Sequence, residues 1–219
     1  VLDALVIEPL SGFANRNPLF VPGFNTLADL VTCSETRSIA EALAEHEANR
    51  SGLSPGSVRD EMARNLQVMY ESVAEGLSGE CKPLAGFIPG DDGHRLFERH
   101  LAGSTLSGGI LPAAIARSLA VGELNSAMGR IVAAPTAGSS GVLPAVLLSV
   151  GEKLGLSDDV LLDALFVAAG VGLVIANTAS FSGAVGGCQG EVGSASAMAA
   201  SAAVYAYGGS MLEAAHAAA

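Results

Sequence analysis

The residues best able to do chemistry gather between Asn177 and Gly193, near the end of this 219-residue chain. This segment holds five glycines, two serines, one glutamate and one cysteine in seventeen residues. So many glycines cost conformational entropy on folding, which is tolerable where another group must approach the backbone closely. The thiol of Cys188 lies among these glycines and close to Glu191. Such a thiol can bind a metal, act as a nucleophile or be inert.

The role of Cys188 depends on the partners that the sequence offers it. A catalytic cysteine needs a histidine base. No motif brings any of the four histidines toward it; they are His46, His94, His100 and His216. A metal or iron–sulfur ligand fits better, because glycines let backbone N–H groups reach the sulfur atoms of a cluster. Cys33 and Cys81 have no comparable surroundings, and we interpret them as structural thiols.

Two further polar turns, at 104–109 and 135–141, resemble the segment around Cys188 in composition. Each of the three is expected just ahead of a helix. Unpaired backbone N–H groups and hydroxyls at the positive end of the helix dipole can there bind a carboxylate or a phosphate. None of them fits the phosphate-binding loop or the dinucleotide fingerprint, which disfavours nucleotide binding. The alternative is that these glycines only allow tight turns between helices.

The charge distribution limits what the protein can bind. The formal net charge of −11 argues against nucleic acid as a partner, because such binding needs a basic face. All eleven Lys and Arg residues lie at or before Lys153, and the 66 residues after it have no cationic side chain except His216. An anionic substrate held by that half would need backbone N–H groups, helix N-termini or a metal.

The remaining composition favours a helical protein of the cytoplasm. Aromatic residues are only 5% of the chain and glycines number 27, so small residues can let helices pack closely. Three cysteines far apart are no disulfide framework, and no signal peptide or lipidation motif is visible. Three uncharged segments, 131–151, 164–190 and 192–212, are interrupted by Gly, Pro or Ser and lack aromatic belts. We therefore expect buried helices and no membrane span.

The elements that must position the three turns are helices. A stripe of apolar residues at spacings of three and four, from Val58 to Leu77, predicts a long amphipathic helix. Ser57 is its expected N-cap, with Asp60 at the capping-box spacing. Two β-like runs, 5–7 and 131–134, are too short to argue for a sheet. Further helices are expected over about 25–31, 35–49, 94–101, from the 104–109 turn to 121, from 123 onward, from the 135–141 turn through 150, from a Ser157 cap through 175, and over 195–207 and 211–219.

The predicted fold class is therefore mainly α. We expect a compact helical domain in which Ser/Gly-rich loops between helices form the site. Residues 1–23, with three prolines and two glycines, are expected to be an extended lead-in left from a linker. Residues 24–219 are expected to form one domain.

Three motifs in the second half of the chain belong together: Pro-Thr-Ala-Gly-Ser-Ser-Gly-Val-Leu-Pro at 135–144, Asn-Thr-Ala-Ser-Phe-Ser-Gly at 177–183 and Gly-Gly-Cys-Gln-Gly-Glu-Val-Gly at 186–193. They closely resemble the α chain, or catalytic domain, of the bacterial iron–sulfur L-serine dehydratases. The segments 104–108 and 125–129 also resemble that family. The resemblance covers the chain from about Phe24 onward.

This resemblance implies a mostly helical enzyme domain that converts L-serine to pyruvate and ammonia. In the family a [4Fe-4S] cluster, and no pyridoxal phosphate, carries the chemistry, with an open iron as Lewis acid on the substrate hydroxyl. A base that the sequence does not identify removes the α-proton. Cys188 matches the family's first cluster cysteine. By motif position the candidate substrate-binding residues are Thr136, Ser139, Ser140, Ser180 and Ser182, together with Ser104 and Ser107.

The chain departs from the family pattern after its last predicted helix. In the family, the helix corresponding to 211–219 leads to Cys-Asp-Pro and Val-Pro-Cys segments that supply two more cluster ligands, and this sequence contains neither. Cys33 and Cys81 do not lie at matching positions. One cysteine cannot hold a [4Fe-4S] cluster, so we expect 24–219 to be an incomplete α-type catalytic domain that is inactive alone. The expected partners are L-serine and a β domain or β subunit, in a homo- or hetero-oligomer.

Two other functions stay open on the sequence alone. One is a related cluster lyase that acts on cysteine or on another small hydroxy or thiol acid. The other is a cluster-free helical subunit that scaffolds or regulates a partner.

Overall fold

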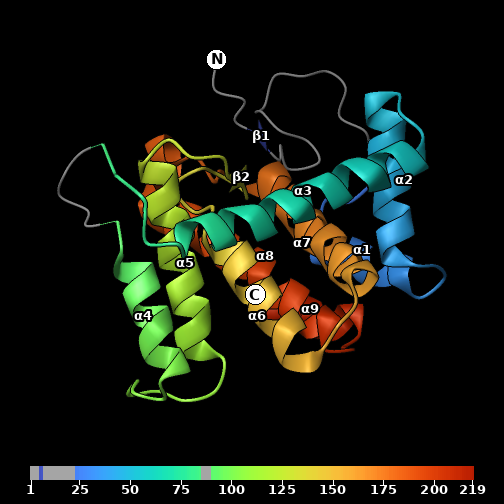
Figure 1. Cartoon of the computed structure of the whole chain (residues 1–219). Coiled ribbons are helices and arrows are strands. Elements are labelled where there is room, and N and C mark those ends of the chain that lie inside the picture. Colours follow the sequence, from blue (N-terminus) through green and yellow to red (C-terminus); the bar gives the residue numbers. More distant parts are fainter. Residues whose placement is uncertain (1–4, 7–22, 85–89) are drawn as a thin grey trace.

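The chain folds almost entirely into helices in the computed structural model, which describes residues 5–6, 23–84 and 90–219 (Figure 1). The helices of this described part are α1 (Leu27–Ser34), α2 (Ile39–Ser51), α3 (Pro55–Gly76), α4 (Asp92–Leu101), α5 (Leu111–Ser126), α6 (Val142–Leu154), α7 (Asp158–Thr178), α8 (Gly183–Ala206) and α9 (Met211–Ala218). The prediction of a mainly α fold is confirmed.

A two-stranded parallel sheet accompanies the helices. Strand β1 (Leu5–Val6) pairs with strand β2 (Val132–Ala133), with Leu5 opposite Val132. These strands come from the two β-like runs of the sequence, each shortened to two residues. Apart from 5–6 and Gly23, the expected lead-in over 1–23 lies outside the described residues.

Helix α7 is the centre of the hydrophobic core. Its residues from Leu161 through Val174 are buried almost without interruption, so the helix is enclosed on all sides. By length and composition α7 could cross a membrane, but 72% of its apolar window is buried inside the fold. Enclosure of this kind marks the core helix of a globular fold. The burial expected for the uncharged segment 164–190 is found through Val174, whereas residues 175–190 are half-buried or exposed.

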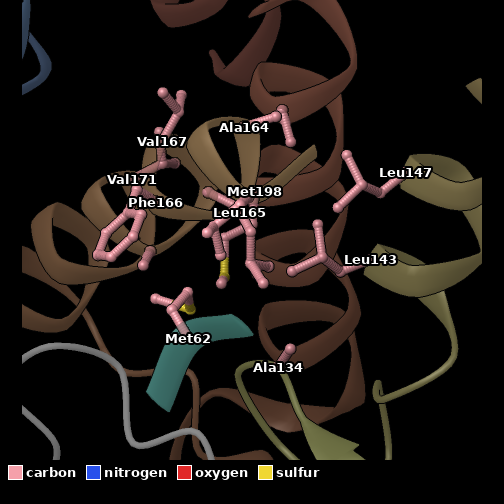
Figure 2. Packing of buried hydrophobic residues seen from close by; sticks show 14 of the residues in the cluster. Met62, Ala134, Leu143, Leu147, Ala164, Leu165, Phe166, Val167, Val171 and Met198 are labelled. Atoms are coloured by element: carbon pink, nitrogen blue, oxygen red, sulfur yellow. The ribbon is translucent and has the colours of Figure 1, made fainter. Parts of the chain in front are cut away.

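Four helices contribute the side chains that meet at this core. Figure 2 shows Leu165 of α7 close to Leu143 of α6, Met62 of α3 and Met198 of α8. A void of about 10 Å³ lies between these residues and Pro135, so packing there is nearly complete. The 135–141 turn is thereby fixed on the edge of the core.

Helix α5 is approached closely by its neighbours at glycines. A Cβ atom on Gly76 of α3 would lie 2.6 Å from the carbonyl carbon of Ala120. A Cβ atom on Gly93 of α4 would lie 2.6 Å from the Ala120 nitrogen, and one on Gly141 would overlap the Ser118 carbonyl oxygen. The expectation that small residues allow close helix packing is confirmed.

The long amphipathic helix of the sequence is α3, and its start differs from the prediction. The stripe is buried as expected at Val58, Met62, Leu66, Met69 and Val73. The predicted cap at Ser57 is wrong, because the Ser54 hydroxyl accepts the hydrogen bond of the Ser57 N–H at 3.1 Å. Proline at the first helical position favours this earlier start, since Pro55 has no N–H to satisfy.

Two other helix boundaries test the sequence reasoning. Helix α5 is continuous, so the predicted break between residues 121 and 123 is wrong. Gly122 inside it lowers helix propensity without ending the helix. Ser157 is the N-cap residue of α7 as predicted, with two aspartates in the first turn, but its side chain makes no capping hydrogen bond.

Candidate functional site

The segment 177–193 is mostly helical, which corrects the prediction of a long glycine loop. Helix α7 continues to Thr178 and α8 begins at Gly183, so residues 179–182 alone lie between them. Gly187 has φ 72° and ψ 171°, which puts a kink inside α8. Cys188 follows the kink directly, and its side chain is exposed. The thiol is accessible, and a helix presents it in place of the expected glycine-rich loop.

The glycines at the start of α8 serve close backbone approach. A Cβ atom on Gly186 would lie 3.1 Å from the Ser180 carbonyl oxygen, and one on Gly190 would lie 3.6 Å from the same atom. The chain ahead of α8 thus folds back along the helix over positions that lack side chains. This arrangement holds 180–182 beside the first turns of α8.

The turn at 135–141 leads from β2 into α6. It begins with a cis peptide bond between Ala134 and Pro135. The hydroxyls of Thr136 and Ser139 are hydrogen-bonded at 3.0 Å, and the side-chain amide of Asn125 donates to the Ala137 carbonyl at 3.1 Å. Ser139 and Ser140 are buried, and within the described residues the Ser140 hydroxyl has no hydrogen-bond partner.

Glu191 joins this turn to the kinked start of α8. Its Oε1 atom accepts a hydrogen bond from the Thr136 hydroxyl. A Cβ atom on Gly138 would lie 2.5 Å from Oε1, and one on Gly183 would lie 2.8 Å from Oε2. Both glycines are therefore needed for the carboxylate to occupy this position. Glu191 and Cys188 are three residues apart in α8 and share one face of the helix.

The three helices that follow Ser/Gly turns have N-termini without side-chain caps. No side chain caps α5, α6 or α8, whereas α1, α2, α3 and α9 have a serine or threonine cap. Helices α4 and α7 also lack a side-chain cap, but Glu123 accepts hydrogen bonds from the first N–H groups of α4. Some of the first N–H groups after these turns bond backbone carbonyls, as Val142 bonds Ser139 and Val185 bonds Ser182, and the others are left to other acceptors. This agrees with the predicted use of such turns for an anion, which stays a prediction.

The candidate hydroxyl residues do not all meet. Thr136 and Ser139 lie beside the Glu191 carboxylate, and Gly183, which directly follows Ser182, lies against its other oxygen. The Ser180 hydroxyl lies close by in sequence but accepts a hydrogen bond from the Ser182 N–H at 3.2 Å.

The turn at 104–109 lies at the other end of α6. Its Gly109 shares a cavity with Glu152 and Lys153, near the C-terminus of that helix, while the 135–141 turn precedes the N-terminus. A helix of thirteen residues is roughly 20 Å long. The structure therefore does not bring Ser104 and Ser107 to the other candidates.

The other thiols and the histidines lie elsewhere. Cys33 and Cys81 are half-buried, and burial, reinforced by Glu123 and Glu75, raises the pKa of the Cys81 thiol. His94 hydrogen-bonds the Leu77 carbonyl at 2.8 Å, which agrees with a structural role. Within the described ranges no three His, Cys, Asp or Glu side chains form a metal-binding group. Within the described residues Cys188 thus offers a single metal ligand.

A comparison with known families decides the affiliation of this chain. Residues 34–219 match the family described as serine dehydratase alpha chain. The chain belongs to the serine dehydratase alpha chain family. The residues described above around Glu191, Thr136 and Cys188 all fall within the matched range.

Curated members of the serine dehydratase alpha chain family extend beyond this chain. A probable L-serine dehydratase alpha chain of Bacillus subtilis is 38% identical over 188 residues, which are 85% of this chain and 62% of the relative. The L-serine dehydratase alpha chain of Peptoniphilus asaccharolyticus is 36% identical over 200 residues, 89% of this chain and 67% of the relative. L-serine dehydratase 1 of Escherichia coli is 44% identical over 94 residues, 42% of this chain and 21% of the relative. The chain spans about two thirds or less of these relatives.

Sequence reasoning missed Glu191 as a member of the candidate site. It is the sole carboxylate between Asp163 and Glu213, which marks it as unusual. Its partner Thr136 is 55 residues away, so no local pattern shows their contact.

Proposed function

We propose that this chain supplies the larger part of the catalytic domain of an L-serine dehydratase. The reaction removes water from L-serine to give aminoacrylate, which tautomerises and is hydrolysed to pyruvate and ammonia. The observation that carries the proposal is the hydrogen bond from Thr136 to Glu191. It joins two of the motifs of this family into one site, one helical turn from Cys188. The names of the Bacillus and Peptoniphilus relatives support L-serine as the substrate.

The residues of this chain would bind and orient the substrate. The Thr136 proton is donated to Glu191, so the donors suited to a substrate carboxylate are backbone N–H groups of the 135–141 turn and of the start of α6, which has no side-chain cap. No Lys or Arg follows Lys153 in the sequence, so these neutral donors replace a cationic side chain. Thr136, Ser139, Ser180 and Ser182 are the proposed contributors, together with Ser140, whose buried hydroxyl has no partner among the described residues.

We also propose that the complete enzyme holds a [4Fe-4S] cluster with Cys188 as one ligand and with no pyridoxal phosphate. The exposed thiol beside a glycine kink fits a cluster ligand, because backbone N–H groups can approach the sulfur atoms there. The other two cysteines would come from outside the residues described above. When bound, the cluster would supply a Lewis acid for departure of the substrate hydroxyl.

The proposed partner is the β domain or β subunit of the same enzyme, within a homo- or hetero-oligomer in the cytoplasm. The alpha-chain names of the relatives support a partner of this kind. Charged residues are only 15% of the chain and several large apolar side chains are exposed on α4, α5 and α8, which also favours a covered surface.

The test is an assay of the complete enzyme purified and reconstituted without oxygen. We expect close to four irons per catalytic domain, and pyruvate and ammonia from L-serine without added pyridoxal phosphate. Cys188→Ser should lose iron and activity together. Cys33→Ser, a matched change at a half-buried thiol on α1, should keep both.

Three outcomes would contradict the proposal. Sulfide released from cysteine, with no pyruvate from serine, would favour the related lyase. An active Cys188→Ser enzyme that depends on pyridoxal phosphate would exclude the cluster mechanism. An intact complex without iron would favour a cluster-free helical subunit.

A further inference from the structure

The Glu191 carboxylate has one oxygen with a hydrogen-bond partner and one without. Oε1 accepts the Thr136 hydroxyl, and no hydrogen bond to Oε2 is found among the described residues. Oε2 faces Gly183, where a Cβ atom would come within 2.8 Å. This oxygen can accept a donor from a bound molecule.

The Thr136 hydroxyl orients the Glu191 carboxylate. Thr136 has a single hydroxyl proton, which it donates to Glu191. The Ser139 hydroxyl has two acceptors within reach, the Thr136 hydroxyl at 3.0 Å and the Thr136 carbonyl at 3.5 Å. The Thr136 proton points toward the carboxylate and orients it without supplying a positive charge.

No cationic side chain of the described structure balances Glu191. The ion pairs found in the described residues join other carboxylates, among them Glu152 and Asp163. The side chain is half-buried, and a half-buried carboxylate is costly without a partner of opposite charge. A bound cation would complete the arrangement.

We propose that Glu191 binds the α-ammonium group of the amino-acid substrate and that Thr136 positions it for this contact. The inference rests on the proposed function, which makes L-serine the ligand. An α-amino acid carries its ammonium and carboxylate groups on one carbon atom, so a site for it needs donors and a carboxylate side by side. Because the Thr136 proton is already donated to Glu191, the backbone N–H groups of the turn at 135–141 are the available donors, and Glu191 lies against that turn at Gly138.

The position of Cys188 agrees with this assignment. Residues three apart in a helix lie about 5–6 Å apart at their Cβ atoms. Cys188 and Glu191 have this spacing in α8, beyond the Gly187 kink. A substrate whose ammonium group contacts Glu191 can therefore extend its hydroxyl end toward the thiol side of the same helix face.

The experiment uses the complete reconstituted enzyme and two unreactive probes in isothermal titration calorimetry. L-Alanine has the ammonium and carboxylate groups without a leaving hydroxyl, whereas in L-lactate a hydroxyl replaces the ammonium group. Glu191→Gln keeps the shape of the side chain and removes its charge. We expect it to weaken L-alanine binding by at least tenfold and to change L-lactate binding by less than threefold. Glu98→Gln, an equal change of charge at an exposed position of α4, should alter neither.

The outcomes separate this inference from the proposed function. Equal weakening of both probes, or unchanged L-alanine binding with loss of turnover, would overturn ammonium recognition by Glu191. A wild-type enzyme that binds no L-alanine would overturn it as well. Selective loss of L-alanine binding in an enzyme that forms no pyruvate from L-serine would support the inference and refute the proposed function. Circular dichroism and the thermal midpoint of each variant show that it is folded.

Discussion

The Thr136 hydroxyl donates a hydrogen bond to the Glu191 carboxylate across 55 residues of chain. This contact ties the turn ahead of α6 to the kinked start of α8, one helical turn beyond Cys188. Glu191 is the one charged residue in the 135–141 turn and the start of α8, and this contact holds the two segments against each other. The site is organised by this single carboxylate and the hydroxyls that point to it.

The first prediction concerns the hydroxyl of Thr136. Thr136→Val keeps the shape of the side chain but removes the donor, so Glu191 loses its orienting bond. A hydrogen bond to a charged group contributes about 1.5–3 kcal/mol, and we expect kcat/KM for L-serine to fall by roughly tenfold to a hundredfold. Thr136→Ser retains the hydroxyl and should keep most of the activity. Equal activity of the valine and serine variants would show that the bond is unimportant.

The second prediction tests the space beside the carboxylate. In Gly138→Ala the new Cβ atom would lie 2.5 Å from Glu191 Oε1 and force the side chain away. The new methyl group meets only the end of the Glu191 side chain, which can move, so the free energy of unfolding should change little. Because the carboxylate is displaced, kcat/KM should fall at least tenfold. Gly122→Ala in α5 adds the same methyl group where nothing lies within 4 Å, and it should leave activity unchanged. Urea denaturation and steady-state kinetics on both variants provide the measurement.

The helices could be predicted because their signals are local. The stripe from Val58 to Val73 has the helical period, and burial follows it in α3. The short β-like runs were also visible, but their pairing with each other was not, because strand partners are set by tertiary structure. The cap of α3 was misplaced by three residues, since Ser54 and Ser57 are equally good cap residues by type and Pro55 decides between them.

The start of α8 could not be predicted from propensity. Each glycine in a helix costs about 1 kcal/mol relative to alanine, so a segment with five glycines indicates a loop. Packing overrides that preference here, because Gly186 and Gly190 let the Ser180 carbonyl lie against the helix. The motifs identified Cys188 and Thr136, but the contact of Thr136 with Glu191 depends on the whole fold.

The third prediction concerns close helix packing. A methyl group in Gly76→Ala would meet the Ala120 backbone of α5, which cannot move without shifting a helix. Overpacking of this kind costs typically about 1–3 kcal/mol. Gly122→Ala, in the interior of α5 with open space around it, should instead gain about 0.5–1 kcal/mol. Chemical denaturation of the two variants should move the midpoints in opposite directions.

The fourth prediction concerns the buried guanidinium of Arg117. It donates to the Ser149 hydroxyl at 2.6 Å, pairs with Glu152 and lies 5.5 Å from the centre of the Phe97 ring. Its side chain is 9% exposed and that of Glu152 is 69% exposed, so Arg117→Met leaves no buried charge behind. We expect a loss of roughly 1–3 kcal/mol in the free energy of unfolding from the missing bonds.

A matched control for Arg117 is available on α4. Arg95 pairs with Asp92 at 3.5 Å, and both side chains are largely exposed. Exposed pairs of this kind contribute about 0–1 kcal/mol, so Arg95→Met should barely change the urea midpoint. Equal effects of the two methionine variants would show that burial of Arg117 does not matter.

The fifth prediction concerns pH and the two capping boxes, at the starts of α1 and α9. Backbone N–H groups of Asn25 and Thr26 lower the pKa of Asp29 below its usual 3.8, and the N–H and hydroxyl of Ser210 lower the pKa of Glu213 below 4.5. A lowered pKa in the folded state means stabilisation above the usual value, which is lost as the pH falls through the folded pKa. The advantage of wild type over Glu213→Gln should therefore be constant near neutral pH and shrink below pH 4.5. For Asp29→Asn it should shrink below pH 3.8.

The pKa of Glu123 is shifted in the opposite direction to those of Asp29 and Glu213, so Glu123 provides a comparison. Burial raises the pKa of its carboxyl above 4.5, although the N–H groups of Asp92 and Gly93 partly offset this. The folded state then holds the proton more tightly than the unfolded chain, so the contribution of Glu123 to stability falls as the pH rises through the window above 4.5. Urea midpoints of wild type and Glu123→Gln between pH 3 and 7 should diverge in favour of the variant as the pH rises. If the Glu213→Gln and Glu123→Gln curves shift in the same direction with pH, one of these two pKa shifts has the wrong sign.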